Sequence, residues 1–206
     1  MSFAGYQVCL PSGRSGEKGT AYTYVLAGNG VFLDVQGPLL EASALIAPAE
    51  VRGLVNMETR LFFQHGKIPC RLLDLALLVL QASTHEKYLA FRWEQDRYSL
   101  SEPDQEGREA GVQYSVLPDT VVNLHSHPGG LPAFFSGTDD SDDQGFQVSV
   151  VVANLDELFP RARARVCLYG YFWPVPLSWV FEGSVACLDA GLDAGLSGLF
   201  QMGGLG

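Results

Sequence analysis

Two histidines and an aspartate within N-L-H-S-H-P-G-G-L-P-A-F-F-S-G-T-D-D, residues 123–140, have the types and spacing to hold a metal ion. His125 and His127 lie two positions apart, and alternate side chains of an extended strand point to the same side. Asp139 follows His127 by twelve residues, a loop long enough to fold back toward the same ion. Two imidazoles and one carboxylate leave a fourth tetrahedral position for water, which distinguishes a catalytic zinc site from a closed structural one.

The donor set favours Zn²⁺ as the cofactor. It combines two borderline nitrogen donors with a hard oxygen donor and contains no thiolate, so zinc suits it, with iron and manganese as alternatives. Asp140 directly follows Asp139 and is an alternative third ligand. No C-x-x-C pair occurs, so a thiolate zinc knuckle is not expected. The four cysteines are Cys9, Cys70, Cys167 and Cys187.

Hydrolysis at such a site needs a general base and a donor for the oxyanion. Glu86 is the candidate base, because it lies where a predicted helix over residues 70–83 gives way to a strand. A carboxylate at that junction can reach a metal held at a neighbouring strand end. Glu94 and Glu58 are alternatives. Ser136 is the candidate oxyanion donor and equally a candidate N-cap of the helix that follows it.

Hydrophobic periodicity predicts the elements that must position these side chains. Residues 70–83 are apolar nearly all round at helical spacing, which indicates a buried helix packed on a sheet. A strand is predicted over residues 87–93, and the apolar run 121–124 leads directly into the histidines. Residues 146–153 become continuously apolar, which suits a central strand, and residues 161–172 form one or two further strands.

The two ends of the chain carry no chemical motif. Near the N-terminus, apolar runs at residues 22–26 and 31–35 are separated by Gly28-Asn29-Gly30, a hairpin-type turn signal. We therefore predict three parts. These are a β-rich N-terminal region over residues 1–66, a catalytic domain over residues 67–185, and a tail rich in Gly, Ala and Leu over residues 186–206.

Composition excludes several classes of protein. Hydrophobic residues make up 47% and charged residues 17% of the 206 residues, so the chain should fold rather than remain disordered. The net charge of −10 disfavours direct nucleic-acid binding. Arg161, Arg163 and Arg165 alternate with alanines, which predicts the solvent face of a strand. No signal peptide or membrane-spanning segment is apparent, so we expect a cytoplasmic protein with no membrane attachment.

The motif H-S-H-P followed by S-x-x-D, with Glu86 upstream, resembles the JAMM motif of the JAB/MPN metalloproteases. The resemblance covers residues 70–182 and implies a cytidine-deaminase-like α/β fold, with a mixed, mostly antiparallel sheet flanked by helices. It also implies cleavage of peptide or isopeptide bonds at ubiquitin-like proteins. The roles it assigns are zinc ligands His125, His127 and Asp139, general base Glu86 and oxyanion donor Ser136.

A narrower resemblance rests on L-P-A-F-F-S-G-T-D-D together with the later Y-G-Y-F-W-P-V-P. These segments are similar to the PRTRC system protein A family, a JAB-type component of a bacterial plasmid or mobile-element cassette. The cassette also encodes ThiF-like and ParB-like proteins, which the resemblance implies as partners. A non-catalytic JAB-fold scaffold for those partners is the alternative function. A zinc nucleobase deaminase would need H-x-E and P-C-x-x-C, and the sequence contains neither.

Overall fold

The computed structural model describes residues 2–108, 111–115, 117–127, 130, 132–185 and 187–189. The predicted tail over residues 186–206 lies almost wholly outside the described residues. The chain divides into two compact units, Met1–His65 and Gly66–Asp193, and each is described by itself.

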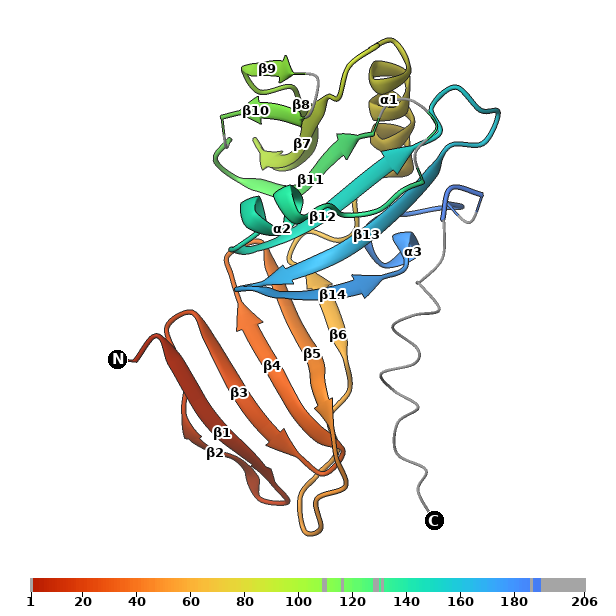
Figure 1. The fold of residues 1–206 in the computed structure, drawn as a ribbon. Helices are drawn as coiled ribbons and strands as arrows, with labels where there is room; N and C mark the ends of the chain where they lie inside the picture. The colour runs from red at the N-terminus through yellow and green to blue at the C-terminus, as the bar shows by residue number, and fades with distance from the viewer. Residues whose placement is uncertain are drawn as a thin grey trace. The chain divides into compact units, whose positions relative to one another are not determined.

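The first unit is a six-stranded mixed sheet (Figure 1). Strands β1 and β3 run parallel, and the other neighbouring pairs run antiparallel. The spatial order is β2-β1-β3-β4-β5-β6. The strands are β1 (Ala4–Leu10), β2 (Gly13–Glu17), β3 (Tyr22–Ala27), β4 (Gly30–Gln36), β5 (Leu40–Pro48) and β6 (Arg60–Phe63).

The hairpin predicted around Gly28-Asn29-Gly30 is confirmed. Strands β3 and β4 pair up to Ala27 and Gly30, which leaves a two-residue loop. Gly30 has a φ of 137°, and an added Cβ would collide with the carbonyl oxygen of Ala47. This position therefore requires glycine. Beside the turn, buried side chains form a small core. They are Val25, Ala27 and Phe32, with Cys9, Leu45 and Met57 packed against them.

The second unit is built on another six-stranded sheet, in the order β14-β13-β12-β11-β7-β8 (Figure 1). Among the described strands of this sheet, β11 and β12 are the one parallel pair. Strands β9 and β10 form a separate hairpin. The elements are α1 (Cys70–Gln81), β7 (Tyr88–Glu94), β8 (Arg97–Ser101), β9 (Gln105–Arg108), β10 (Gly111–Tyr114), β11 (Thr120–Ser126), α2 (Gly137–Asp142), β12 (Phe146–Ala153), β13 (Arg161–Leu168), β14 (Tyr171–Val175) and α3 (Leu177–Val180).

The fold is mixed α/β with few helices, which confirms the predicted class. Strand β12 is central and is buried throughout residues 148–153, as its continuous apolar run predicts. Helix α1 is less buried than predicted: Leu73, Ala76 and Leu80 are buried, whereas Leu78 is 64% exposed. A single apolar stripe is enough to hold a helix on a sheet. No described helix has the length and apolar character needed to cross a membrane.

Candidate metal centre

The two histidines stand at the end of β11, where strand pairing on both sides fixes their direction. His125 lies opposite Tyr88 of β7 and Val151 of β12. His127 continues the pairing beyond the strand, since its backbone N–H donates to the carbonyl of Val152 at 2.8 Å. Both side chains are buried, and their ring centroids lie 5.1 Å apart. The backbone pairing therefore turns both imidazoles to one side of the sheet.

Helix α2 brings Asp139 to the histidines. Ser136 is the N-cap and forms a capping box with Asp139. The Asp139 N–H donates to the Ser136 hydroxyl at 3.3 Å, and the Ser136 N–H donates to Oδ2 of Asp139 at 2.5 Å. The carboxylate is thereby oriented, with Oδ1 3.2 Å from Nε2 of His125 and Oδ2 4.0 Å from Nε2 of His127. The predicted N-cap role of Ser136 is confirmed.

Glu86 joins the same group from the segment between α1 and β7. The ligand atoms of Glu86, His125 and His127 all lie within 4.8 Å of one another. Its rival Glu94 lies at the far end of β7, where it accepts a hydrogen bond from Ser99 and pairs with Arg92.

The two remaining alternatives are Glu58 and Asp140. Glu58 belongs to the first unit. Asp140 pairs with Arg165 rather than with a histidine. The structure therefore brings together Glu86, His125, His127 and Asp139, and within the second unit it leaves Glu94 and Asp140 outside the group.

The chain's own atoms at this site fit a divalent cation. Among the described residues, Nε2 of His125 and Nδ1 of His127 are buried and have no hydrogen-bond partner. The contact between His125 and Asp139 is close, but its alignment is not that of a hydrogen bond. Buried polar atoms without partners are costly. A cation bound between the imidazoles and the carboxylate would satisfy Nε2 of His125, the atom that faces Asp139.

The protonation states also suit a metal. Burial lowers the pKa of His125 to about 4, although Asp139 opposes the shift. Burial likewise lowers the pKa of His127. Both imidazoles are therefore neutral at neutral pH, the form that ligates metals. Burial, and secondly the charge of Asp139, raises the pKa of Glu86, which is the direction expected of a general base.

The model of the family described as prokaryotic homologs of the JAB domain matches residues 47–167. The chain belongs to this family. The match begins within β5 and includes Glu86, β11 and α2. Comparisons with curated proteins and with solved structures each found no match. Membership of the JAB family, together with the group of Glu86, His125 and His127, indicates a JAMM-like metallohydrolase.

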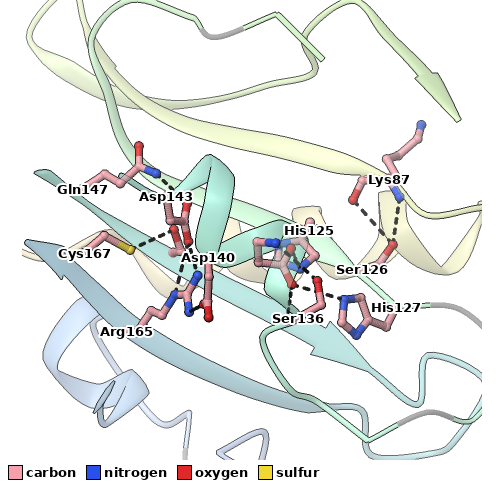
Figure 2. A network of polar contacts seen from close by, with 12 residues as sticks. Lys87, His125, Ser126, His127, Ser136, Asp140, Asp143, Gln147, Arg165 and Cys167 are labelled. Carbon is pink, nitrogen blue, oxygen red and sulfur yellow. Dashed lines mark hydrogen bonds and ion pairs between the residues drawn. The ribbon is translucent and has the colours of Figure 1, made fainter. Parts of the chain in front are cut away.

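The prediction that Arg165 faces solvent is wrong. Arg161, at the start of β13, is exposed as predicted, but Arg165 of this JAB chain is only 4% exposed. Figure 2 shows its guanidinium pointing toward Asp140 and Asp143, with which it forms ion pairs. The alternation of residues along a strand predicts the face of the sheet from which a side chain points. It does not predict whether another element covers that face. The acidic residues that follow Asp139 were the one available signal.

Sequence reasoning also missed Ser126, the residue between the two histidines. Its side chain is buried, and its hydroxyl accepts a hydrogen bond from the backbone N–H of Lys87 at 3.1 Å (Figure 2). The backbone N–H of Ser126 donates to the carbonyl of Lys87 at 3.0 Å. Lys87 directly follows Glu86, so Ser126 links the two parts of the JAB site.

Proposed function

We propose that this chain is a zinc-dependent hydrolase that cleaves peptide or isopeptide bonds. The observation that carries the proposal is the convergence of Glu86 on His125 and His127, with Asp139 against the same histidines. His125, His127 and Asp139 would hold the ion. Bound Zn²⁺ supplies Lewis-acid polarisation of the scissile carbonyl and brings the pKa of water close to neutral.

Glu86 is assigned the proton transfer. Its carboxylate takes a proton from the attacking water as the water oxygen bonds to the carbonyl carbon. It then gives that proton to the amine nitrogen as the carbon–nitrogen bond breaks. A carboxylate whose pKa is raised performs both steps more easily at neutral pH than one with an ordinary pKa.

Ser136 is assigned to the oxyanion. Its oxygen accepts the backbone N–H of Asp139, which leaves the hydroxyl proton free to donate. A donor held at the start of α2, three residues before Asp139, is in place before the substrate arrives. The ring centroid of Phe134 lies 5.0 Å from that of His127, and Phe134 is 40% exposed. We assign it to contact the substrate beside the scissile bond.

The substrate we propose is an extended protein tail, such as that of a ubiquitin-like protein, that binds by strand addition. Strand β8 pairs with β7 only as far as Ser101 and Ala90. Beyond that point, the side chain of Gln105 accepts from the N–H of Tyr88 at 2.8 Å and donates to its carbonyl at 3.1 Å. A side-chain amide thus occupies a strand edge two residues from Glu86, and an extended peptide could replace it.

The test combines zinc content with cleavage of a ubiquitin-like fusion protein. Wild type, Glu86→Ala and Glu94→Ala should all carry zinc. Glu86→Ala should lose activity by about 10²- to 10⁴-fold, the usual contribution of a general base. Glu94→Ala is the matched control at the other end of the same strand and should keep its activity. A zinc-loaded wild type that hydrolyses no such substrate would refute the enzyme proposal.

The alternative function, a non-catalytic scaffold, would be favoured by a Glu86 that lies far from the metal ligands. Its carboxylate instead lies within 4.8 Å of both histidine ligand atoms, so no observation favours a non-catalytic role.

We also propose that the enzyme works with ThiF-like and ParB-like proteins of a PRTRC cassette. The support is limited to two sequence segments, residues 131–140 and 169–176. Co-purification of the tagged chain with either protein after co-expression tests this. If neither protein co-purifies, the cassette assignment is refuted, whereas the hydrolase proposal is unaffected.

A further inference from the structure

Helix α2 carries Asp139 but has little to hold it in place. It is six residues long, all of them described, and none is buried. Such a short helix has almost no stability of its own, and it has no apolar face to pack on the sheet. A metal ligand nevertheless needs to be held to within about 0.5 Å. The position of Asp139 must therefore depend on polar contacts made by its neighbours.

Arg165 of β13 supplies contacts at both ends of this helix (Figure 2). Its Nη1 donates to Oδ1 of Asp140, in the first turn, at 2.5 Å. Its Nη2 and Nε donate to Oδ2 of Asp143, the C-cap residue, at 2.7 and 3.2 Å. This buried guanidinium thus ties the start and the end of α2 to the six-stranded sheet of the second unit. Charge-assisted, two-point contacts of this kind fix orientation as well as distance.

The same guanidinium also contacts the residue that leads into the helix. Its Cζ lies 3.9 Å from the ring centroid of Phe135 on one side and 4.1 Å from that of Phe172 on the other. Phe135 immediately precedes the N-cap Ser136, and it packs on buried Ala133, Val151 and Ala153. Arg165 therefore contacts three points of the segment that presents Asp139.

Replacing Arg165 would leave these partners uncompensated. The Asp143 carboxylate is buried, and it also accepts a hydrogen bond from the side chain of Gln147 at 2.6 Å. A buried carboxylate that loses its cation moves toward water or takes up a proton. Because the backbone N–H of Asp143 donates to the carbonyl of Asp139 at 2.9 Å, such a movement would be transmitted to the ligand.

We propose that Arg165 is a positioning residue that sets metal affinity by holding the Asp139 carboxylate against His125 and His127. The inference rests on the proposed function only in requiring a metal at this site. A purely structural role would stabilise the fold without any specific link to Asp139. The two roles differ in whether the effect of Arg165 on metal binding depends on the Asp139 side chain.

The experiment is a double-mutant cycle on zinc affinity in the full chain, measured by competition with a chromophoric chelator. The four proteins are wild type, Arg165→Gln, Asp139→Asn and the double variant. Arg165→Gln should weaken zinc binding by about 10- to 100-fold, the range found when a group that orients a ligand is lost. In the Asp139→Asn background, the same change should have almost no further effect. Arg161→Gln, exposed on the same strand, is the matched control and should bind zinc like wild type.

Two results would overturn the proposal. One is a folded Arg165→Gln protein that binds zinc as tightly as wild type. The other is an equal loss of affinity in both backgrounds, which would show that Arg165 only stabilises the fold. A wild type that binds no zinc would remove both this proposal and the proposed function. Zinc binding without hydrolysis would remove the proposed function alone.

A second variant covers the case in which Arg165→Gln does not fold. Asp140→Asn removes only the partner whose side chain is 47% exposed, so the protein should stay folded. It should lose zinc affinity by a few-fold, again only when Asp139 is present. Hydrogen exchange of the metal-free protein should also show faster exchange at the amides of Asp140 and Asp143. Unchanged zinc affinity and unchanged exchange in this variant would contradict the proposal.

Discussion

The Ser126 hydroxyl lies 3.1 Å from the backbone nitrogen of Lys87 and 3.5 Å from its carbonyl oxygen. Ser126 separates the two histidines of the candidate metal centre, and Lys87 follows the proposed general base. The contact therefore fixes the end of β11 to the start of β7, and so sets the distance of Glu86 from the imidazoles. The residue between the two histidines of the H-x-H motif therefore positions the proposed general base.

Replacing Ser126 by alanine should lower catalytic turnover while leaving zinc affinity almost unchanged. The substitution leaves the Lys87 N–H without its side-chain partner, which should lower the free energy of unfolding by about 1–2 kcal/mol. Turnover should fall because Glu86 is less firmly placed, whereas zinc affinity should change little because both histidines remain. Ser126→Thr retains the hydroxyl and serves as the control. Denaturant unfolding, zinc titration and cleavage assays measure the free energy of unfolding, the zinc affinity and the turnover. Equal losses of turnover in Ser126→Ala and Ser126→Thr would show that the hydroxyl does not position Glu86.

Zinc removal should lower thermal stability to an extent set by the affinity. Ligand that binds only the folded state adds about 2.7 kcal/mol to the free energy of unfolding at one hundred times its Kd. Treatment with a chelator should therefore lower Tm, and added zinc should restore it. His127→Ala should show a much smaller response, whereas His65→Ala should respond like wild type. A full zinc response in His127→Ala would mean that the ion binds elsewhere.

The metal-free protein should lose stability as the pH falls from about 6.5 toward 4. The ordinary pKa of histidine is 6.5, and burial lowers that of His125 to about 4 in the folded state. Above pH 6.5 the imidazole is neutral in both states. Between these values the unfolded chain binds a proton that the folded chain does not, so the free energy of unfolding decreases. Below about pH 4 both states bind it and the decrease from this group ends.

Variants isolate the share of this loss that belongs to His125. In chelator, His125→Gln should show a shallower decline in Tm across the window, whereas exposed His85→Gln should follow the wild type. Thermal unfolding at half-unit pH intervals provides the measurement. Parallel curves for His125→Gln and wild type would show that the buried imidazole is not responsible.

Local patterns were enough to predict the strands and the helix around the site, but not β1, β2, β8 or β9. The apolar run of β12 and the Gly28-Asn29 turn specify their structure within a few residues, because burial and backbone sterics act there locally. The histidine pair is equally local, since two positions along a strand restore the same face. Helix α1 showed the limit: its sequence is apolar nearly all round, but the sheet covers only one stripe.

The choice between neighbouring carboxylates could not be made from sequence. Successive residues of a helix point about 100° apart, so either Asp139 or Asp140 could have faced the histidines. In the structure Asp140 pairs with Arg165, which leaves Asp139 to face the histidines. The burial of Arg165 beside α2 depends on tertiary packing, which the sequence pattern does not predict. Glu86 precedes β7 and Glu94 is its last residue, and only the register of β7 on β11 places Glu86 beside the histidines.

In the first unit, Asp34 should contribute more to stability than a surface ion pair does. Its buried carboxylate lies 2.8 Å from Nη1 of Arg14 and accepts the buried hydroxyl of Ser43. Asp34→Ala leaves that hydroxyl without its partner, so the free energy of unfolding should fall by about 2–4 kcal/mol. Glu41→Ala breaks the more exposed pair with Arg60 and should cost less than about 1 kcal/mol. Denaturant unfolding compares the two variants, and an equal cost would show that burial adds nothing to the Asp34 contacts.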